Sequence, residues 1–176
     1  MKLLAGKPSF QKVLEKVMRE SKWGRILPNG HGLGISIHKT RGSIAGAVIE
    51  VSTDVNGMLN LNKAWIAIDC GKVINPNTVR AQMEGGFTFG LSATLGEEIT
   101  LKDGRVEQSN FHDYSILRLK GSPEISVEII ESGNEIGGVG EVAVPLAAPA
   151  LTNAIFSSSG RRIRTLPLSK HGIKIT

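Results

Sequence analysis

The chain has 176 residues, 40% of them hydrophobic, and a formal net charge of +5. This length suffices for one domain with a buried core, and the composition is that of a globular protein rather than of a disordered chain. No apolar run approaches the roughly 18 residues of a membrane-spanning helix, and the first residues lack the apolar core of a signal peptide. As written, the sequence is that of a chain that stays in the cytoplasm where it is made, without a membrane span, and its final compartment is left open.

Cysteine and histidine usage argues against a metal held by side chains. The single cysteine, Cys70, excludes an internal disulfide and a cysteine-clustered zinc or iron–sulfur site. The four histidines are scattered, without the paired spacing of metal ligands. We therefore expect no metal-ligating residues in this chain.

Positive charge is densest in residues 160–174, "GRRIRTLPLSKHGIK". Aromatic residues make up only 5% of the chain, and no stacking or zinc-finger pattern is present. A solvated tail, or one that docks on another subunit, is therefore favoured over nucleic-acid binding.

Residues 8–24 have the apolar spacing of an amphipathic helix, with Ser9 placed to cap its start and Gly24 to end it. A loop of turn-forming residues follows this helical pattern. The first element is therefore expected to be a helix with one buried face.

Three strands are predicted next, at residues 33–39, 42–54 and 58–71, because β-branched residues alternate there with small or polar ones. Asn56 and Gly57 separate the last two. This pair is typical of a type I′ turn, in which both central residues have positive φ. The last two strands should therefore be antiparallel neighbours.

Residues 74–98 change to a helical period, with Asn75 as the expected N-cap and Pro76 as the first helical residue. One face is apolar, formed by Val79, Met83 and Phe87. Glycine inside a helix costs about 1 kcal/mol relative to alanine. Close packing against another backbone or a bulky ligand is expected to offset this cost at Gly85, Gly86 and Gly90.

The remaining elements are a hairpin around Asp103-Gly104, a strand at 124–132 and a final helix that ends at Gly160. Pro149 is expected in the first turn of that helix. Its apolar positions recur at helical spacing: Leu146, Ala147, Ala150, Leu151, Ala154 and Ile155. The sequence thus predicts one α+β domain, residues 1–176, with a mixed β-sheet and hairpins packed by about three helices.

The stretch "GGVGE", residues 137–141, places a carboxylate at the end of a glycine turn. Near a helix N-terminus Glu141 would stay ionised, and it would be able to act as a general base if it faced a cleft. Capping of the helix is the more common role of such an acid. The run lacks the Gly-Lys-Ser/Thr ending of a phosphate-binding loop.

Two further positions are candidates for a functional role. Gln82 offers a donor and an acceptor, which suits an oxo group or a pterin amide, although a lone glutamine is more often a surface residue. Asp69 and Cys70 end a strand, where a satisfied turn is favoured over a nucleophile.

Three stretches together resemble the end of a molybdenum hydroxylase large subunit, in the xanthine dehydrogenase and aldehyde oxidase family. The similarity is strongest to its isoquinoline 1-oxidoreductase and bacterial aldehyde dehydrogenase branch. The stretches are residues 67–114, beginning "AIDCGKVINPNTVRAQMEGG", residues 123–130, "PEISVEII", and residues 137–168, beginning "GGVGEVAVPLAAPALTNAIF".

The resemblance implies a role for each matching residue. Glu141 matches the family's catalytic base, and Gln82 matches a glutamine beside a molybdenum-pterin cofactor. Gly138, Val139 and Gly140 match the turn that brings the glutamate to the metal. The pterin holds the metal in this family, which agrees with the expected lack of protein ligands.

The resemblance also implies an activity and partners. The family hydroxylates N-heterocycles or oxidises aldehydes with oxygen derived from water, and its large subunit is several times longer than this chain. We therefore expect the C-terminal portion of a molybdopterin-binding domain, whose partners are the upstream part of the large subunit, a 2Fe–2S small subunit and a small-molecule substrate. The isolated chain is expected to be inactive and cofactor-free. The alternative is a non-catalytic remnant that serves as a scaffold or interaction module.

Overall fold

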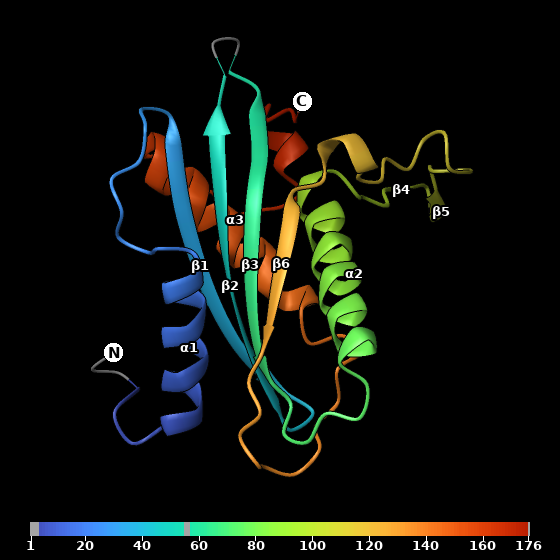
Figure 1. The fold of residues 1–176 in the computed structure, drawn as a ribbon. Coiled ribbons are helices and arrows are strands. Elements are labelled where there is room, and N and C mark those ends of the chain that lie inside the picture. The colour runs from blue at the N-terminus through green and yellow to red at the C-terminus, as the bar shows by residue number, and fades with distance from the viewer. Residues whose placement is uncertain (1–3, 55–56, 176) are drawn as a thin grey trace.

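The computed structural model describes residues 4–54 and 57–175 and shows a mixed four-stranded sheet between two helical layers (Figure 1). The strand order is β1-β2-β3-β6, in which β3 and β6 are parallel and the other pairs antiparallel. The strands are β1 (His31–Thr40), β2 (Ser43–Thr53), β3 (Leu59–Asp69) and β6 (Glu124–Ile129). The helices are α1 (Pro8–Glu20), α2 (Pro76–Leu95) and α3 (Val144–Ser159). The predicted α+β class is confirmed.

Side-chain alternation on β2 explains the two layers. Ala47 and Ile49 face the larger core, which α2 and α3 cover, whereas Val48 faces the smaller core under α1. Successive residues of a strand point to opposite faces, so both faces of this central strand are buried. The sheet is therefore covered by α1 on one side and by α2 and α3 on the other.

The first helix begins one residue earlier than its predicted cap. Lys7 is the N-cap and Pro8 the first helical residue, so the prediction that Ser9 caps the helix is wrong. Proline is favoured in the first turn because its missing N–H has no partner to lose there. The helix ends at Glu20, four residues before Gly24.

The three predicted strands and the β2–β3 pairing are confirmed, with Ser52 opposite Asn60 near the turn. Val55 and Asn56 lie outside the described residues, so the predicted Asn56-Gly57 turn is not tested there. Gly57 itself has a φ of +78°.

The glycines of α2 have different environments. A Cβ on Gly90 would lie 2.4 Å from the carbonyl oxygen of Val144 and 2.8 Å from the Cβ of Ala147, so α3 packs directly on this point of α2. A Cβ on Gly86 would lie 3.4 Å from the Cβ of Ala143. Gly85 has no neighbour within 4 Å. Close helix packing thus accounts for Gly90, but nothing within the described chain accounts for Gly85.

The last helix, α3, begins at Val144 with Pro145 in its first turn, so the expected late start at Pro149 is wrong. Pro149 lies inside the helix with its side chain exposed. Gly160 ends the helix in the left-handed conformation, as predicted. The six predicted apolar positions of this helix are all buried.

The small elements are β4 (Leu101–Lys102), β5 (Arg105–Val106) and the 3₁₀ turns η2 (Leu119–Gly121) and η3 (Leu168–His171). The predicted hairpin is confirmed, because Asp103 and Gly104 both have positive φ between β4 and β5. Figure 1 shows this hairpin projecting away from the sheet.

The basic C-terminal segment packs on the domain, so the predicted solvated tail is wrong. Ile163 and Leu168 are buried in the larger core, and Ile175 forms a bridge to Leu59 at the start of β3. Its cations remain on the surface of the domain. In the part of the chain that the structure describes, no helix has the length and apolar character needed to cross a membrane.

Candidate functional site

The glycine loop, residues 137–141, follows β6, and α2 begins near the same end of the sheet, where β3 and β6 finish (Figure 1). Gln82 lies on the exposed side of α2, in its second turn. Its amide nitrogen is 3.9 Å from the position that a Cβ of Gly140 would occupy. Two residues 58 positions apart in the sequence are therefore neighbours in space.

The glycine loop is fixed by its backbone. The Gly137 N–H donates to the Cys70 carbonyl at 2.9 Å, and the Gly138 N–H donates to the Arg41 carbonyl at 2.8 Å. The Ser43 hydroxyl donates to the Gly138 carbonyl at 2.6 Å. A Cβ on Gly137 would lie only 2.2 Å from the Ser43 hydroxyl oxygen, so the approach of the loop to the β1–β2 turn requires glycine.

A buried carboxylate organises the chain that leads into this loop. Asp69, at the end of β3, accepts hydrogen bonds from the Ser132 hydroxyl at 2.6 Å and from the Asn134 side-chain amide at 3.3 Å. It also accepts from the Gly71 N–H at 3.1 Å. The prediction of a satisfied turn here is confirmed.

The neighbouring thiol, that of Cys70, is buried. Burial, and then the charge of Asp69, raise the pKa of Cys70 above its ordinary value. The thiol therefore remains protonated near neutral pH, and its carbonyl serves as an anchor for the loop.

Glu141 lies three residues before α3, and its side chain is exposed. Its carbonyl accepts the Val144 N–H at 3.1 Å, but its carboxylate has no hydrogen-bond or ion-pair partner among the described residues. No side chain caps the start of α3. The alternative in which Glu141 is a helix cap is therefore wrong, and the carboxylate is free to meet a ligand.

Val139 has a structural position within the loop. It is half-buried against the larger core and borders a hollow of about 210 Å³ beside the start of α2. The start of α2 is capped as predicted, since the Asn75 side chain accepts from the N–H groups of Asn77 and Thr78. Val139 thus anchors the glycine turn, and its two neighbours Gly138 and Gly140 remain exposed.

Two residues of the site were missed from the sequence. Arg41 and Ser43 belong to the tight turn between β1 and β2, and they hold the loop through a carbonyl and a hydroxyl. "TRGS" indicates a turn, but no local pattern indicates which distant loop it will contact. Within residues 4–54 and 57–175, no group of three or more His, Cys, Asp or Glu side chains is placed to hold a metal ion.

Comparison with known proteins identifies the family of this fold. Residues 32–123 match the family model of the molybdopterin cofactor-binding domain. The chain belongs to the molybdenum hydroxylases of the xanthine dehydrogenase and aldehyde oxidase family.

Individual relatives agree with this assignment. The chain is 33% identical over 165 residues to the beta subunit of isoquinoline 1-oxidoreductase from Brevundimonas diminuta, a match that covers 92% of this chain and 21% of that protein. It is 31% identical over 164 residues to a membrane-bound aldehyde dehydrogenase from Gluconacetobacter polyoxogenes, covering 89% of this chain and 21% of that one. The chain therefore spans about a fifth of the length of these curated relatives.

Solved structures have the same fold. Quinoline 2-oxidoreductase from Pseudomonas putida superposes with a TM-score of 0.65 at 27% identity, over 72% of this chain and 17% of that one. An aldehyde oxidoreductase from Desulfovibrio desulfuricans gives a TM-score of 0.62 at 26% identity, over 71% of this chain and 14% of that one.

Proposed function

We propose that this chain forms one side of the molybdenum cofactor site in an enzyme that hydroxylates an N-heterocycle or oxidises an aldehyde, with oxygen derived from water. The observation that carries this proposal is the meeting of the Gln82 amide with the glycine loop, beside the unpartnered carboxylate of Glu141. The names of the relatives, which include oxidoreductases of both kinds, support the two substrate classes.

The residues present suit a polar heterocyclic cofactor. Gln82 offers an exposed amide, and the N–H groups of Gly140 and Glu141 donate to no acceptor among the described residues. Gly138 and Gly140 leave the surface open where a side chain would stand. We infer that Gln82 and the turn Gly138–Gly140 contact the molybdenum-pterin cofactor, which supplies two-electron redox chemistry when bound.

Glu141 acts as the general base in this proposal. Its carboxylate is exposed and has no competing partner among the described residues, so it is able to take a proton from the water-derived oxygen nucleophile. The anchored loop keeps Gly140 beside Gln82, and Glu141 is the next residue, so the proton acceptor and the cofactor contact belong to one site.

The remainder of the site comes from elsewhere in this proposal. Residues 1–176 form one domain that corresponds to the C-terminal portion of a molybdopterin-binding domain, and the upstream part of the large subunit supplies the rest. A separate 2Fe–2S protein accepts the electrons. Several relatives are named as subunits, which supports an assembly of several chains. The chain by itself neither retains the cofactor firmly nor turns over substrate.

Molybdenum content tests this proposal. The chain is expressed alone, and together with polypeptides encoded beside its gene, in a host that makes the cofactor. Molybdenum is measured by plasma mass spectrometry after size-exclusion chromatography. We expect about one equivalent in a co-eluting complex and little in the chain alone. A well-folded chain without metal in every combination would instead favour a non-catalytic scaffold.

A further inference from the structure

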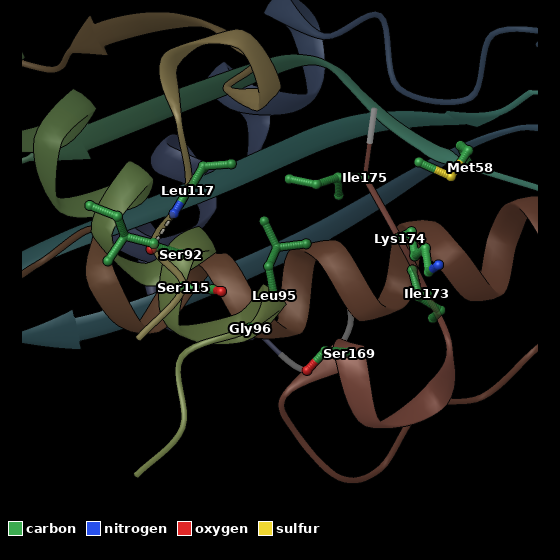
Figure 2. A pocket seen from close by; sticks show the side chains of 11 residues that line it. Met58, Ser92, Leu95, Gly96, Ser115, Leu117, Ser169, Ile173, Lys174 and Ile175 are labelled. Carbon is green, nitrogen blue, oxygen red and sulfur yellow. Dashed lines mark hydrogen bonds between the residues drawn. The ribbon is translucent and has the colours of Figure 1, made fainter. Parts of the chain in front are cut away.

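A second hollow lies at the other end of α2, far from the glycine loop. It has a volume of about 400 Å³ and lies where the end of α2, the segment 115–117 and the C-terminal segment meet the start of β3 (Figure 2). Most of its wall is apolar, contributed by Met58, Leu95, Ile116, Leu117, Ile173 and Ile175.

This pocket is separate from the candidate cofactor site. Gln82 and Leu95 are thirteen positions apart on one continuous helix. At 1.5 Å per residue, this separation corresponds to roughly 20 Å along the helix axis. A ligand of the size that fits this pocket cannot reach both places at once.

Backbone contacts hold the walls of the pocket in place. The Leu59 N–H donates to the Lys174 carbonyl at 2.8 Å, and Leu59 also forms the bridge to Ile175. On the other side, the Leu117 N–H donates to the Ser92 hydroxyl at 2.8 Å. The pocket is therefore preformed, as most small-molecule sites are, and its volume lies within their usual range of roughly 300–1,000 Å³.

The polar groups of the pocket favour an anion. Lys174 is the only charged residue in its lining, and no acidic partner for its ammonium group is present among the described residues. Ser115 and Ser169 also line the pocket, and neither hydroxyl makes a hydrogen bond within the described chain. One cation and two available hydroxyl donors, set in an apolar wall, match a single anionic head group on an apolar body.

The two acids that follow Gly96 both have partners outside the pocket lining. Glu98 forms an ion pair with Lys170, and Glu97 accepts a hydrogen bond from the Tyr114 hydroxyl. Lys170 thus neutralises Glu98, and Glu97 keeps its charge but has a hydrogen-bond partner, whereas the ammonium group of the lysine that lines the pocket has neither kind of partner among the described residues.

We propose that this pocket binds a small carboxylate with an apolar body, of the size of a medium-chain fatty acid. The alkyl chain fills the space between Leu95 and Ile175, and the carboxylate faces Lys174 at the edge. This site is independent of the cofactor site, so it stands or falls separately from the proposed function.

Charge-matched probes of one chain length test the proposal. Octanoate, 1-octanol and octylammonium are titrated into the full chain and followed by amide chemical shifts. We expect saturable one-to-one binding of octanoate, at least tenfold tighter than 1-octanol, with octylammonium weakest. Hexanoate should bind roughly tenfold more weakly than octanoate, because each buried methylene contributes about 0.8 kcal/mol. The shifted amides should be those of Gly96, Leu117 and Ile173.

Variants separate the charge from the cavity. Lys174→Met keeps the apolar stem and should reduce the preference for octanoate over 1-octanol to less than twofold. Lys12→Met makes the same change on the exposed side of α1 and should leave it unchanged. Leu95→Trp fills the pocket and should abolish binding. Equal affinity for octanoate and 1-octanol, indifference to Lys174→Met, or shifts centred on Gly140 would each overturn the assignment.

Discussion

The two ends of α2 differ in the charged group that lies near each without a partner among the described residues. At its N-terminal half, Gln82 lies beside a loop with a free carboxylate, and the surroundings are polar and fixed by hydrogen bonds. At its C-terminal end, Leu95 borders an apolar pocket in which the one charged side chain is a lysine. One helix thus supports two surfaces of different chemistry, one polar and one largely apolar. Ligand chemistry is decided by the segments that meet the helix, rather than by the helix itself.

The largest expected effect is a loss of activity on replacing Glu141, near the N-terminal half of α2. In a reconstituted holoenzyme, Glu141→Gln should lower kcat by roughly 10²–10⁴-fold, because a positioned general base contributes about that much. Folding should be unaffected, since the carboxylate has no partner among the described residues. Steady-state kinetics at matched molybdenum content measure this. A loss under about tenfold would deny Glu141 the base role.

Replacing two glycines in the middle of α2 by alanine should change the stability of the chain in opposite directions. Gly90→Ala places a methyl group 2.4 Å from the Val144 carbonyl oxygen, so α3 must move, at a cost of about 1–3 kcal/mol. Gly85→Ala meets nothing within 4 Å and should stabilise the chain by up to about 1 kcal/mol through helix propensity. Urea unfolding of both variants measures the difference. Equal effects of the two changes would contradict the packing described here.

The support of the glycine loop should depend on Asp69. In Asp69→Asn, one side-chain oxygen that accepts from Ser132 or Asn134 is replaced by a donor, so about 1–3 kcal/mol should be lost. Exchange of the Gly137 and Gly138 amide hydrogens should accelerate.

A matched change in an exposed turn is the control for that loss. Asp103→Asn alters a residue with positive φ that asparagine tolerates, so stability should change little. If both variants lost the same stability, the buried network around Asp69 would not be the cause.

The smallest effect concerns the turn that precedes the pocket wall. Hydrogen bonds from the Ser109 and Asn110 N–H groups lower the pKa of Asp113 to about 2. Because the folded-state pKa lies below the ordinary value of 3.8, the turn is fully stabilised above pH 3.8 and loses this contribution as the pH falls through 2. A carboxyl titration by NMR measures the pKa. An ordinary value would show that these hydrogen bonds do not persist in solution.

Local sequence patterns predicted the secondary structure well, because apolar period and turn chemistry are local properties. The three strands, the Asn75 cap and the Gly160 end are of this kind. The start of α3 was misplaced, since two prolines fit a helix start equally well by pattern and only the tertiary packing of Leu146 and Ala147 places it.

The candidate site was predictable only in part. Gln82 and residues 138–141 were found by resemblance, whereas Arg41 and Ser43 were missed because they lie 97 and 95 positions before Gly138, the loop residue that they contact. The apolar pocket was also missed. Its walls come from four separate segments, none of which has a recognisable pattern by itself.

The parallel pairing of β3 with β6 has a consequence for synthesis on the ribosome. Strands β1 to β3 pair with near neighbours in sequence, but β6 must wait until α2 and the β4–β5 hairpin have been made. Domains form progressively as the chain emerges, and pairings between distant segments form slowly. The glycine loop and α3 follow β6 in the chain. Strands β1 to β3 therefore emerge before α3 is available to cover their face of the sheet. Nascent chains that stall before residue 137 would therefore present an apolar sheet surface to chaperones, and the proposed catalytic loop would be among the last parts to take shape.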